Sequence, residues 1–404
     1  APPSNWQSVF GGPAWSWDAR RKQYYMHNFL REQPQLNVGL GAVQDALLDV
    51  ARFWLERGVD GFRLDAINFA IHNPELTDNP PSGAPMETVT RPFDMQRHVH
   101  NQSQPAIPAF LERIRAVMDE YGAVFSVAEV GGPAPLDEMK AFTAGTRRLH
   151  SAYSFDFLYA DTLTPEGVRA ALSNWSDAPG EGWPSWAFSN HDAPRAVSRW
   201  AGGHGTEQVS KLLLLLLLSL RGNPFVYQGE ELGLPQSAVA FEHLKDPEAL
   251  ANWPHTLGRD GARTPFPWAT QAASAGFSSS AETWLPMDTG HAAHAVDRQA
   301  QHPSSCLNVT RALLAIRNAA PALRCGTLEF LKTPETVLAY IRQVEGEQVL
   351  CAFNLGDEAA SWEPASPWAQ SGELIASQDG PAAGPLPRSL PARAGYWAKL
   401  GPGE

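Results

Sequence analysis

Two opposite charges stand inside a short segment that otherwise has the composition of a buried strand. In VDGFRLDAINF, residues 59–69, Arg63 and Asp65 alternate with Phe62 and Leu64. Because neighbouring strand residues point to opposite faces, the two charged side chains share one face and the two apolar ones share the other. A charge that leaves water must be paired or put to use. The segment therefore predicts either an Arg–Asp pair that only satisfies itself or a functional site.

Two further acids close predicted strands in the same way. Glu129 ends AVFSVAEV (123–130), and Asp192 ends PSWAFSNHD (184–192). In a barrel of alternating strands and helices, the loops after the carboxyl ends of the strands build the active site. Close carboxyls at that rim raise each other's proton affinity, so one can stay protonated while another stays ionised. Hydrolysis of a glycosidic bond needs this division of labour.

The elements that must position these acids alternate between helices and strands. Apolar residues at helical spacing predict helices over 42–57 and 107–121, which Gly58 and Gly122 end. The other predicted elements are strands at 59–65, 123–130, 151–158, 184–192 and 223–231, a helix at 165–174, and a Leu-rich helix that Thr206 caps and Gly222 ends. This alternation indicates parallel βαβ units. A doubly wound sheet would also produce it, but acids at the strand ends favour a (β/α)8 barrel.

Two regions depart from the alternating pattern. Residues 72–105 are rich in Pro, Asn, Gln and Asp, which predicts a long insertion after the strand of Asp65. From about residue 327, strand-like runs follow one another with turns and no helices: TLEFLK, TVLAYIR, QVLCAFNL and AGYWAKL. The pattern predicts a C-terminal antiparallel β-domain.

Composition limits the partners of this chain of 404 residues. With 43% hydrophobic and 18% charged residues it has enough apolar residues for a sizeable core, and its net charge of −12 argues against nucleic acid or an anionic membrane as the main partner. KLLLLLLLSL (211–220) is too short to span a bilayer. Cys306, Cys325 and Cys351 lack CxxC spacing, which predicts reduced thiols and a cytoplasmic location.

Three of these motifs together resemble a known family. DGFRLDAINF, VAEV and FSNHD are similar to the second, third and fourth signature regions of the α-amylase family, glycoside hydrolase family 13. Residues 5–37, 258–268 and 313–323 are similar to further stretches of its α-glucosidase and oligo-1,6-glucosidase branch. The matching stretches follow the order of that branch across nearly the whole chain. The resemblance implies that the two charges of the opening segment face a sugar-binding pocket.

The resemblance also implies a role for individual residues. The nucleophile falls on Asp65, the general acid/base on Glu129 and the third acid on Asp192. The residues implied to bind the same sugar are Arg63, His191, Arg263 and, in the wall of the pocket, Phe10. No cofactor is required by this mechanism. His98 and His100 resemble a metal-binding pair, but they lie in the polar insertion, and we expect surface histidines and no metal.

The chain departs from the family pattern at its beginning. The family's early signature, Asp-x-x-x-Asn-His after the third barrel strand, is absent, so the resemblance implies that the N-terminal barrel strands are missing. Another chain or segment is then expected to supply them, and a structural Ca or Mg ion could belong to that part. The implied domains are the end of an inserted subdomain (1–34), the barrel from strand four onward (35–326) and the β-domain (327–404). A second departure is Gln35, where the family usually has Asp.

The function implied is that of a retaining, exo-acting α-glucosidase on short substrates such as maltose and aryl α-glucosides. An α-glucosyltransferase would use the same residues, and a non-catalytic scaffold relative would have lost the acids that this chain keeps. The insertion at 72–105 is expected to close the pocket against polymers. Ala66 follows the nucleophile, and in the resembling branch a small residue there goes with α-1,4 bonds and Val with α-1,6 bonds.

Overall fold

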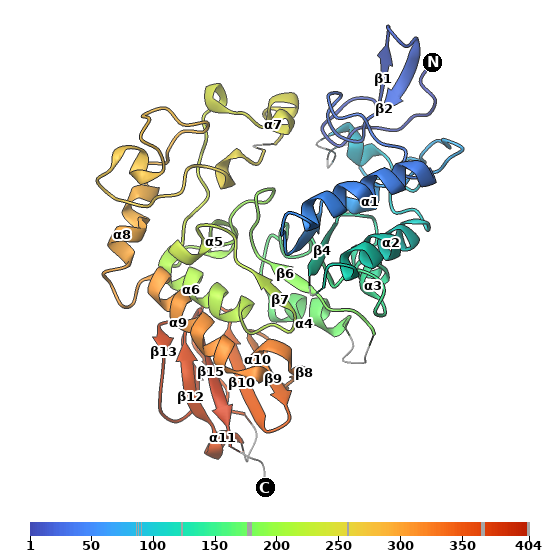
Figure 1. The fold of residues 1–404 in the computed structure, drawn as a ribbon. Helices are drawn as coiled ribbons and strands as arrows, with labels where there is room; N and C mark the ends of the chain where they lie inside the picture. The colour runs from blue at the N-terminus through green and yellow to red at the C-terminus, as the bar shows by residue number, and fades with distance from the viewer. Residues whose placement is uncertain are drawn as a thin grey trace. The chain divides into compact units, whose positions relative to one another are not determined.

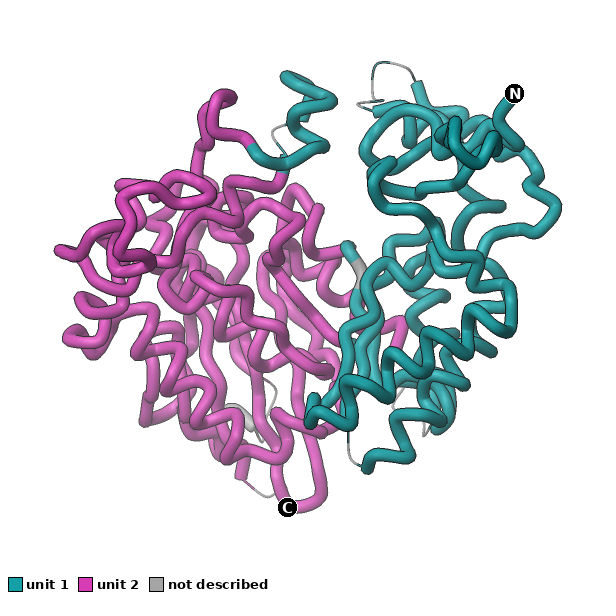
Figure 2. Tube along the Cα trace, turned by 45° about the horizontal axis from the view of Figure 1, so that its top comes forward, with its two compact units in different colours: residues 1–155, 178–184, 245–258 teal, residues 156–177, 185–244, 259–404 magenta. Residues whose placement is uncertain are grey.

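The chain divides into two compact units. The computed structural model describes residues 1–401 apart from 86, 88, 90, 123, 176–179, 257 and 365–367. Unit 1 comprises residues 1–155, 178–184 and 245–258, and unit 2 comprises residues 156–177, 185–244 and 259–404 (Figure 2). Ala123, which begins a predicted strand, and residues 402–404 of the predicted β-domain lie outside the described residues, as do 86, 88 and 90 of the predicted insertion.

Unit 1 contains a three-stranded parallel sheet in the order β3–β4–β5. Its strands are β3 (Gly61–Leu64), β4 (Phe125–Val130) and β5 (Ser151–Ser154) (Figure 1). In the parallel register Arg63 lies opposite Val127, and Glu129 lies opposite Tyr153. The sheet therefore places residues from three distant parts of the chain at one end, as the alternating pattern predicts.

The helices of unit 1 end where their glycines indicate. Helix α1 (Gly41–Leu55) is followed by Gly58 at φ +87°, and helix α2 (Ile107–Asp119) by Gly122 at φ +88°. Both values lie in the left-handed region that glycine adopts without a steric cost. Each glycine thus turns the chain from a helix into the next parallel strand. A third helix, α3 (Pro135–Thr143), follows β4.

The strand predicted over 151–158 is shorter in the structure. β5 ends at Ser154, which pairs with Val130, the last residue of β4. Beyond this point β4 offers no further backbone partner in the ladder, so the chain turns after Ser154. The end of β5 therefore coincides with the end of its neighbour β4, and the sequence of 151–158 alone does not reveal where β4 ends.

The predicted insertion packs against the N-terminal segment within unit 1. The buried Trp6 donates its indole N–H to the carbonyl of Thr77 at 2.8 Å, and Asn5 and Asn79 exchange two hydrogen bonds. The prediction of surface histidines in the insertion is wrong for His98, which is buried and stacks on Phe93 with ring centroids 3.6 Å apart. The other elements of this region are β1 (Trp15–Asp18), β2 (Gln23–Met26), η1 (Ile67–Phe69) and η3 (Pro92–Met95).

Unit 2 contains a second pair of parallel strands, β6 (Ser185–Ala187) and β7 (Asn223–Phe225). The strands predicted over 184–192 and 223–231 are therefore wrong in length, since the ladder has three residue pairs. Asp192 consequently lies in a turn beyond β6 and does not close the strand. The helices around this pair are α4 (Pro165–Ser173), α5 (Ala196–Trp200) and α6 (Thr206–Leu217).

The Leu-rich helix α6 differs from its prediction at both ends. Gly205 is its N-cap residue, Thr206 is the first residue inside the helix, and the helix ends at Leu217, before Gly222. From Val209 onward every residue of α6 is buried. Among the residues that the structure describes, no helix is long and apolar enough to cross a membrane.

A six-stranded antiparallel sheet forms the C-terminal part of unit 2, in the order β13–β12–β15–β10–β9–β8. Helices α6 and α9 (Cys306–Ala319) pack against it (Figure 1). This sheet confirms the predicted antiparallel β-domain. Its strands are β8 (Thr327–Phe330), β9 (Val337–Val344), β10 (Glu347–Asn354), β12 (Glu373–Ser377), β13 (Gly380–Pro381) and β15 (Ala394–Leu400).

Short elements complete the described chain. They are α7 (Pro247–Asn252) in unit 1 and, in unit 2, η4 (Glu230–Leu232), η5 (Phe241–His243), η6 (Asp260–Ala262), η7 (Ala273–Gly276), η8 (His291–His294), α8 (Val296–Gln299), α10 (Pro321–Cys325), β11 (Ala360–Ser361), α11 (Trp368–Ser371) and β14 (Ser389–Leu390).

Candidate active site

In unit 1, Arg63 joins two of the predicted acids. Its Nη1 lies 2.6 Å from Asp65 Oδ1, and its Nη2 lies 2.8 Å from Glu129 Oε1. Arg63 lies in β3, Asp65 directly follows that strand, and Glu129 comes from the neighbouring strand β4. The guanidinium offers several N–H donors in a fixed fork, which suits it to hold two carboxyl groups at once. Residues 63, 65 and 129 therefore form one cluster.

The two acids of this cluster have contrasting surroundings. The side chain of Asp65 is 75% exposed, whereas that of Glu129 is 7% exposed. Burial raises the pKa of Glu129 to about 7; its hydrogen bond with Asp65 adds to this, and Arg63 opposes it. Asp65 lies in water beside a guanidinium, and both conditions favour the charged carboxylate. Near neutral pH the pair can therefore contain one proton donor and one anion.

Tyr153 is a member of this cluster that the sequence did not reveal. Its hydroxyl accepts a hydrogen bond from Arg63 Nε at 2.9 Å and donates one to Glu129 Oε1 at 3.2 Å. Burial raises the pKa of Tyr153, so the phenol keeps its proton and remains a donor. In the sequence Tyr153 stands in the predicted strand SAYSFDFL and has the appearance of a core residue. Its position opposite Glu129 follows from the register of β4 and β5.

The residue after Asp65 also contacts the buried acid. Ala66 has φ +41°, in the left-handed region, and its backbone N–H donates to Glu129 Oε2 at 3.2 Å. The 3-10 turn η1 follows at once, and its residues Ile67, Asn68 and Phe69 are buried. The chain thus leaves β3 through a tight, buried turn that holds one oxygen of Glu129 from the backbone.

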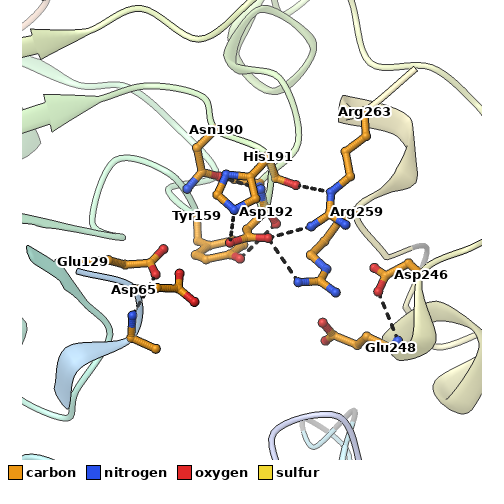
Figure 3. Close-up of polar contacts among 12 residues, drawn as sticks. Asp65, Glu129, Tyr159, Asn190, His191, Asp192, Asp246, Glu248, Arg259 and Arg263 are labelled. Carbon is orange, nitrogen blue, oxygen red and sulfur yellow. Dashed lines mark hydrogen bonds and ion pairs between the residues drawn. The ribbon is translucent and has the colours of Figure 1, made fainter. Parts of the chain in front are cut away.

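In unit 2, Asp192 is surrounded by basic side chains. Its Oδ1 lies 2.7 Å from Arg263 Nη2 and 3.1 Å from Arg259 Nη1, and its Oδ2 lies 3.2 Å from His191 Nε2 (Figure 3). Arg263 also donates from Nε to the carbonyl of His191 at 2.7 Å. The structure therefore brings together the predicted residues 191, 192 and 263. Arg259 is an additional member of this cluster.

The turn that carries Asp192 is held by its neighbours. Asn190 Oδ1 accepts hydrogen bonds from the backbone N–H groups of Asp192 and Ala193, each at 2.8 Å, which is the pattern of an Asx turn. Tyr159 donates its hydroxyl hydrogen to the Asp192 carbonyl at 3.1 Å (Figure 3). Asn190, Tyr159 and Arg259 were missed by sequence reasoning. Asn190 could have been found, because Asn two residues before a polar turn position is a common turn signal.

Phe10, the predicted wall residue, lies in an aromatic row within unit 1. Its ring lies 5.8 Å from that of Phe29, which in turn lies 5.3 Å from that of Phe69 in η1. Through Phe29, Phe10 is therefore connected to the turn that follows Asp65. The predicted wall residue thus packs in an aromatic row that reaches this turn.

The described residues contain no group of three or more His, Cys, Asp or Glu side chains that could hold a metal ion. His98 is engaged in the interior, with Nε2 at 2.8 Å from the Phe93 carbonyl and Nδ1 at 3.1 Å from Asn101 Oδ1. Within the described part of the chain, the polar chemistry of the two clusters thus consists of carboxyl, guanidinium, imidazole and phenol groups.

Family models cover almost the whole chain. Residues 1–326 match the catalytic domain of α-amylase, and residues 328–397 match the C-terminal domain of maltogenic amylase. The chain belongs to the α-amylase family and is a glycoside hydrolase of that family. This result confirms the family to which the signature motifs of the sequence point.

Individual relatives show which members of the family this chain resembles. A probable α-glucosidase of Rhizobium meliloti is 47% identical over 90% of this chain and 67% of its own length. An oligo-1,6-glucosidase of Parageobacillus thermoglucosidasius is 29% identical over 88% of this chain and 67% of its own. The structure of an α-glucosyl transfer enzyme superposes with a TM-score of 0.90 at 43% identity, covering 99% of this chain and 75% of that one. The chain spans about two thirds of the length of the curated relatives that it matches.

Proposed function

We propose that the protein is a retaining α-glucosidase that removes a terminal α-1,4-linked glucose from short substrates such as maltose and aryl α-glucosides. The observation that carries this proposal is the contrast between Asp65 and Glu129, an exposed and a buried carboxyl group bonded to the same arginine. A retaining glycosidase needs an anionic nucleophile beside a protonated acid. The names of the relatives, an α-glucosidase and an oligo-1,6-glucosidase, support the substrate class.

In the first half of the proposed reaction, Asp65 attacks the anomeric carbon and Glu129 gives its proton to the glycosidic oxygen. The C1–O bond breaks, the alcohol leaves, and glucose becomes esterified to Asp65. In the second half, Glu129 takes a proton from water, the water oxygen attacks C1, and the ester bond to Asp65 breaks. Both halves invert C1, so the product keeps the α configuration.

The shared arginine suits this sequence of events. During the first half the negative charge leaves Asp65 and appears on Glu129. Arg63 is bonded to both groups, so a positive charge stays beside whichever carboxyl group is ionised. The protein need not reorganise as the charge moves, which is the electrostatic advantage of a preformed site.

For the cluster of unit 2 we propose the binding of sugar hydroxyls. Asp192 with its two guanidinium partners is suited to accept hydrogen bonds from hydroxyls, and His191, whose side chain is 47% exposed, can donate one. The family order of the motifs supports the assignment of Asp192, His191 and Arg263 to the same glucosyl unit as Asp65. Phe10 is proposed as a wall of that pocket, and the insertion at 72–105 as its cover.

The finer predictions from the sequence remain part of this proposal. Membership of the family supports a (β/α)8 barrel as the catalytic fold. A cytoplasmic location rests on the cysteines Cys306, Cys325 and Cys351, which form no disulfide among the described residues. The missing N-terminal barrel strands, the segment that would supply them and a Ca or Mg ion there stay predictions.

Transfer of glucose to an alcohol is the second candidate function. The 0.90 TM-score to an α-glucosyl transfer enzyme favours it specifically. Both activities share the first half of the reaction and differ in whether water or a sugar hydroxyl attacks the ester. Chromatography of products from maltose, with and without an added alcohol, will measure their ratio.

The proposed mechanism is tested by the anomer released first. Time-resolved NMR of maltose or aryl-glucoside hydrolysis should show α-glucose before mutarotation. β-Glucose as the first product would contradict the assignment of Asp65 as nucleophile. Absence of glucose release from maltose and from aryl α-glucosides would contradict the function itself.

A further inference from the structure

We propose that Gln35 is a positioning residue for the catalytic pair: its side-chain amide, oriented by a row of buried asparagines, holds the turn that follows Asp65. This inference rests on the proposed glucosidase function and adds a group that touches neither substrate nor reacting atoms. Gln35 lies far from Asp65 in the sequence. The contacts that connect them lie entirely within unit 1.

The turn after Asp65 fixes one hydrogen bond of the acid. It begins at Ala66, whose N–H bonds Glu129 Oε2, and closes with a hydrogen bond from Phe69 N–H to the Ala66 carbonyl at 2.9 Å. Ala66 and Phe69 are thus the two ends of one small ring of backbone. A displacement of Phe69 would move the Ala66 N–H away from Glu129.

Gln35 holds the far end of this turn. Its Nε2 donates to the carbonyl of Phe69 at 3.0 Å, and its own N–H donates to the Met26 carbonyl at 2.8 Å. Phe69 is 8% exposed, so water is a poor substitute for this donor. Asn68, the preceding residue, is held from the other side by Ser103, whose N–H donates to its carbonyl at 2.6 Å.

The amide of Gln35 is oriented by a row of buried asparagines. Asn28 Nδ2 donates to Gln35 Oε1 at 3.2 Å, Asn101 Nδ2 donates to Asn28 Oδ1 at 3.2 Å, and Asn79 Nδ2 donates to Asn101 Oδ1 at 2.8 Å. Asn28, Asn79 and Asn101 are each at most 3% exposed. All the bonds run in one direction. The row therefore turns the oxygen of Gln35 toward Asn28 and its NH2 group toward Phe69.

With the partners that this chain provides, the Asn28 amide and the Phe69 carbonyl, position 35 consequently requires a carboxamide. A carboxylate of the same shape would place an acceptor against the Phe69 carbonyl, and an apolar side chain would leave that carbonyl without its donor. With the turn released, Ala66 would hold Glu129 less well. The Ala66 N–H lowers the pKa of Glu129, so its loss raises that pKa and lets the acid stay protonated to higher pH.

The experiment compares Gln35→Met and Gln35→Glu with the same two substitutions at Gln208. Gln208 also donates its amide to a backbone carbonyl, that of Ala392 at 3.3 Å, but it lies on α6 in unit 2. In the complete protein, pH profiles of kcat/KM are measured with an aryl α-glucoside. Titration of labelled Glu129 by NMR, which does not depend on activity, accompanies them.

Both Gln35 variants should lower kcat about tenfold, because a small misplacement of reacting groups is costly. Both should also move the basic limb of the profile, and the Glu129 titration, to higher pH. Gln35→Met adds no charge, so its shift cannot come from a new carboxylate, and the Gln208 variants should leave both readouts unchanged. An unshifted titration in Gln35→Met would overturn the inference, even if the variant melts earlier. A wild-type protein without glucosidase activity would instead contradict the proposed function, while the titration would still report on Gln35.

Discussion

The clusters around Glu129 and around Asp192 differ in the number of guanidinium groups that bond each carboxyl group. In unit 1, Arg63 bonds both Asp65 and Glu129, whereas in unit 2 both Arg259 and Arg263 bond Asp192. A cation shared by two acids compensates one negative charge, so the more buried acid keeps a proton near neutral pH. The two guanidinium groups fix the carboxyl group of Asp192 in place, which suits it to bind substrate hydroxyls. The number of arginines per carboxyl group thus differs between the cluster that we propose for chemistry and the cluster that we propose for binding.

The largest effect is expected from removing the exposed acid of the shared cluster. Asp65→Asn keeps the size of the side chain but removes the proposed nucleophile and the ion pair with Arg63. We expect kcat to fall on the order of 10⁴-fold, as for other residues that form the covalent bond. Steady-state kinetics with maltose measures it. Asp60→Asn, at the exposed start of the same segment, should remain fully active, and substantial activity of Asp65→Asn would reassign the nucleophile.

A smaller effect is expected in the cluster with two arginines, and it should appear in binding. Arg263→Lys loses the fork that bonds Asp192 and the His191 carbonyl together. Loss of a charged hydrogen bond costs about 1.5–3 kcal/mol, which predicts a rise in KM of about 10- to 100-fold with less change in kcat. Arg259→Lys should have a weaker effect in the same direction. If Arg263→Lys instead abolished kcat at saturating substrate, the separation between chemistry and binding would be wrong.

The third prediction concerns pH and the proton of the shared cluster. Because the pKa of Glu129 is raised to about 7, activity should fall above about pH 7 as this acid deprotonates. Tyr153→Phe removes a donor that favours the charged carboxylate, so the basic limb should move to higher pH, with kcat/KM reduced about tenfold. Profiles of kcat/KM against pH provide the measurement.

A second acid with a raised pKa makes a control for this limb necessary. Burial raises the pKa of Glu230, in unit 2, to about 7 as well. Glu230→Gln should leave the basic limb in place if Glu129 is responsible for it. Loss of the basic limb in Glu230→Gln, or an unchanged limb in Tyr153→Phe, would contradict the assignment of this proton to Glu129.

The smallest effect is expected at Ala66, beside the shared cluster. Its φ of +41° is unfavourable for a β-branched residue, so Ala66→Val should destabilise the protein by about 1–3 kcal/mol. A change in methyl groups in a pocket shifts specificity by about 1–3 kcal/mol, and we expect maltose to lose its advantage over isomaltose in this variant. Thermal unfolding and the ratio of kcat/KM for the two disaccharides measure the two effects.

The wild-type protein tests the linkage preference and the size limit. Faster cleavage of isomaltose than of maltose would contradict the proposed preference for α-1,4 bonds. Cleavage of starch as fast as maltose would contradict the proposed cover of the pocket by the insertion.

Local signals in the sequence predicted the parts of the fold that local interactions determine. Gly58 and Gly122 end their helices because their positive φ is a property of the residue itself. Strand lengths were less predictable, because β5 ends where its neighbour β4 ends and not where its own apolar pattern does. The buried state of His98 likewise depends on Phe93 and Asn101, and a polar composition does not reveal such partners.

The candidate site shows the same limit. Arg63 and Asp65 could be recognised because residues two apart in a strand point to the same face. Glu129 and Asp192 could be recognised because they lie in family motifs. Tyr153 could not, because its two partners come from two other strands and its own strand carries no charged residue. Gln35 and Arg259 act through residues that are distant in the sequence, and their types alone indicate no partner.

The division of roles within the shared cluster is tested most directly by trapping the covalent intermediate. In Glu129→Gln, an activated 5-fluoro-α-glucosyl fluoride can still be attacked, because its leaving group needs no proton, whereas water lacks its general base. Mass spectrometry of proteolytic peptides should then find one 5-fluoroglucosyl group, attached to Asp65. A 5-fluoroglucosyl group on Asp192, or rapid turnover of the fluoride without any labelled peptide, would contradict the account.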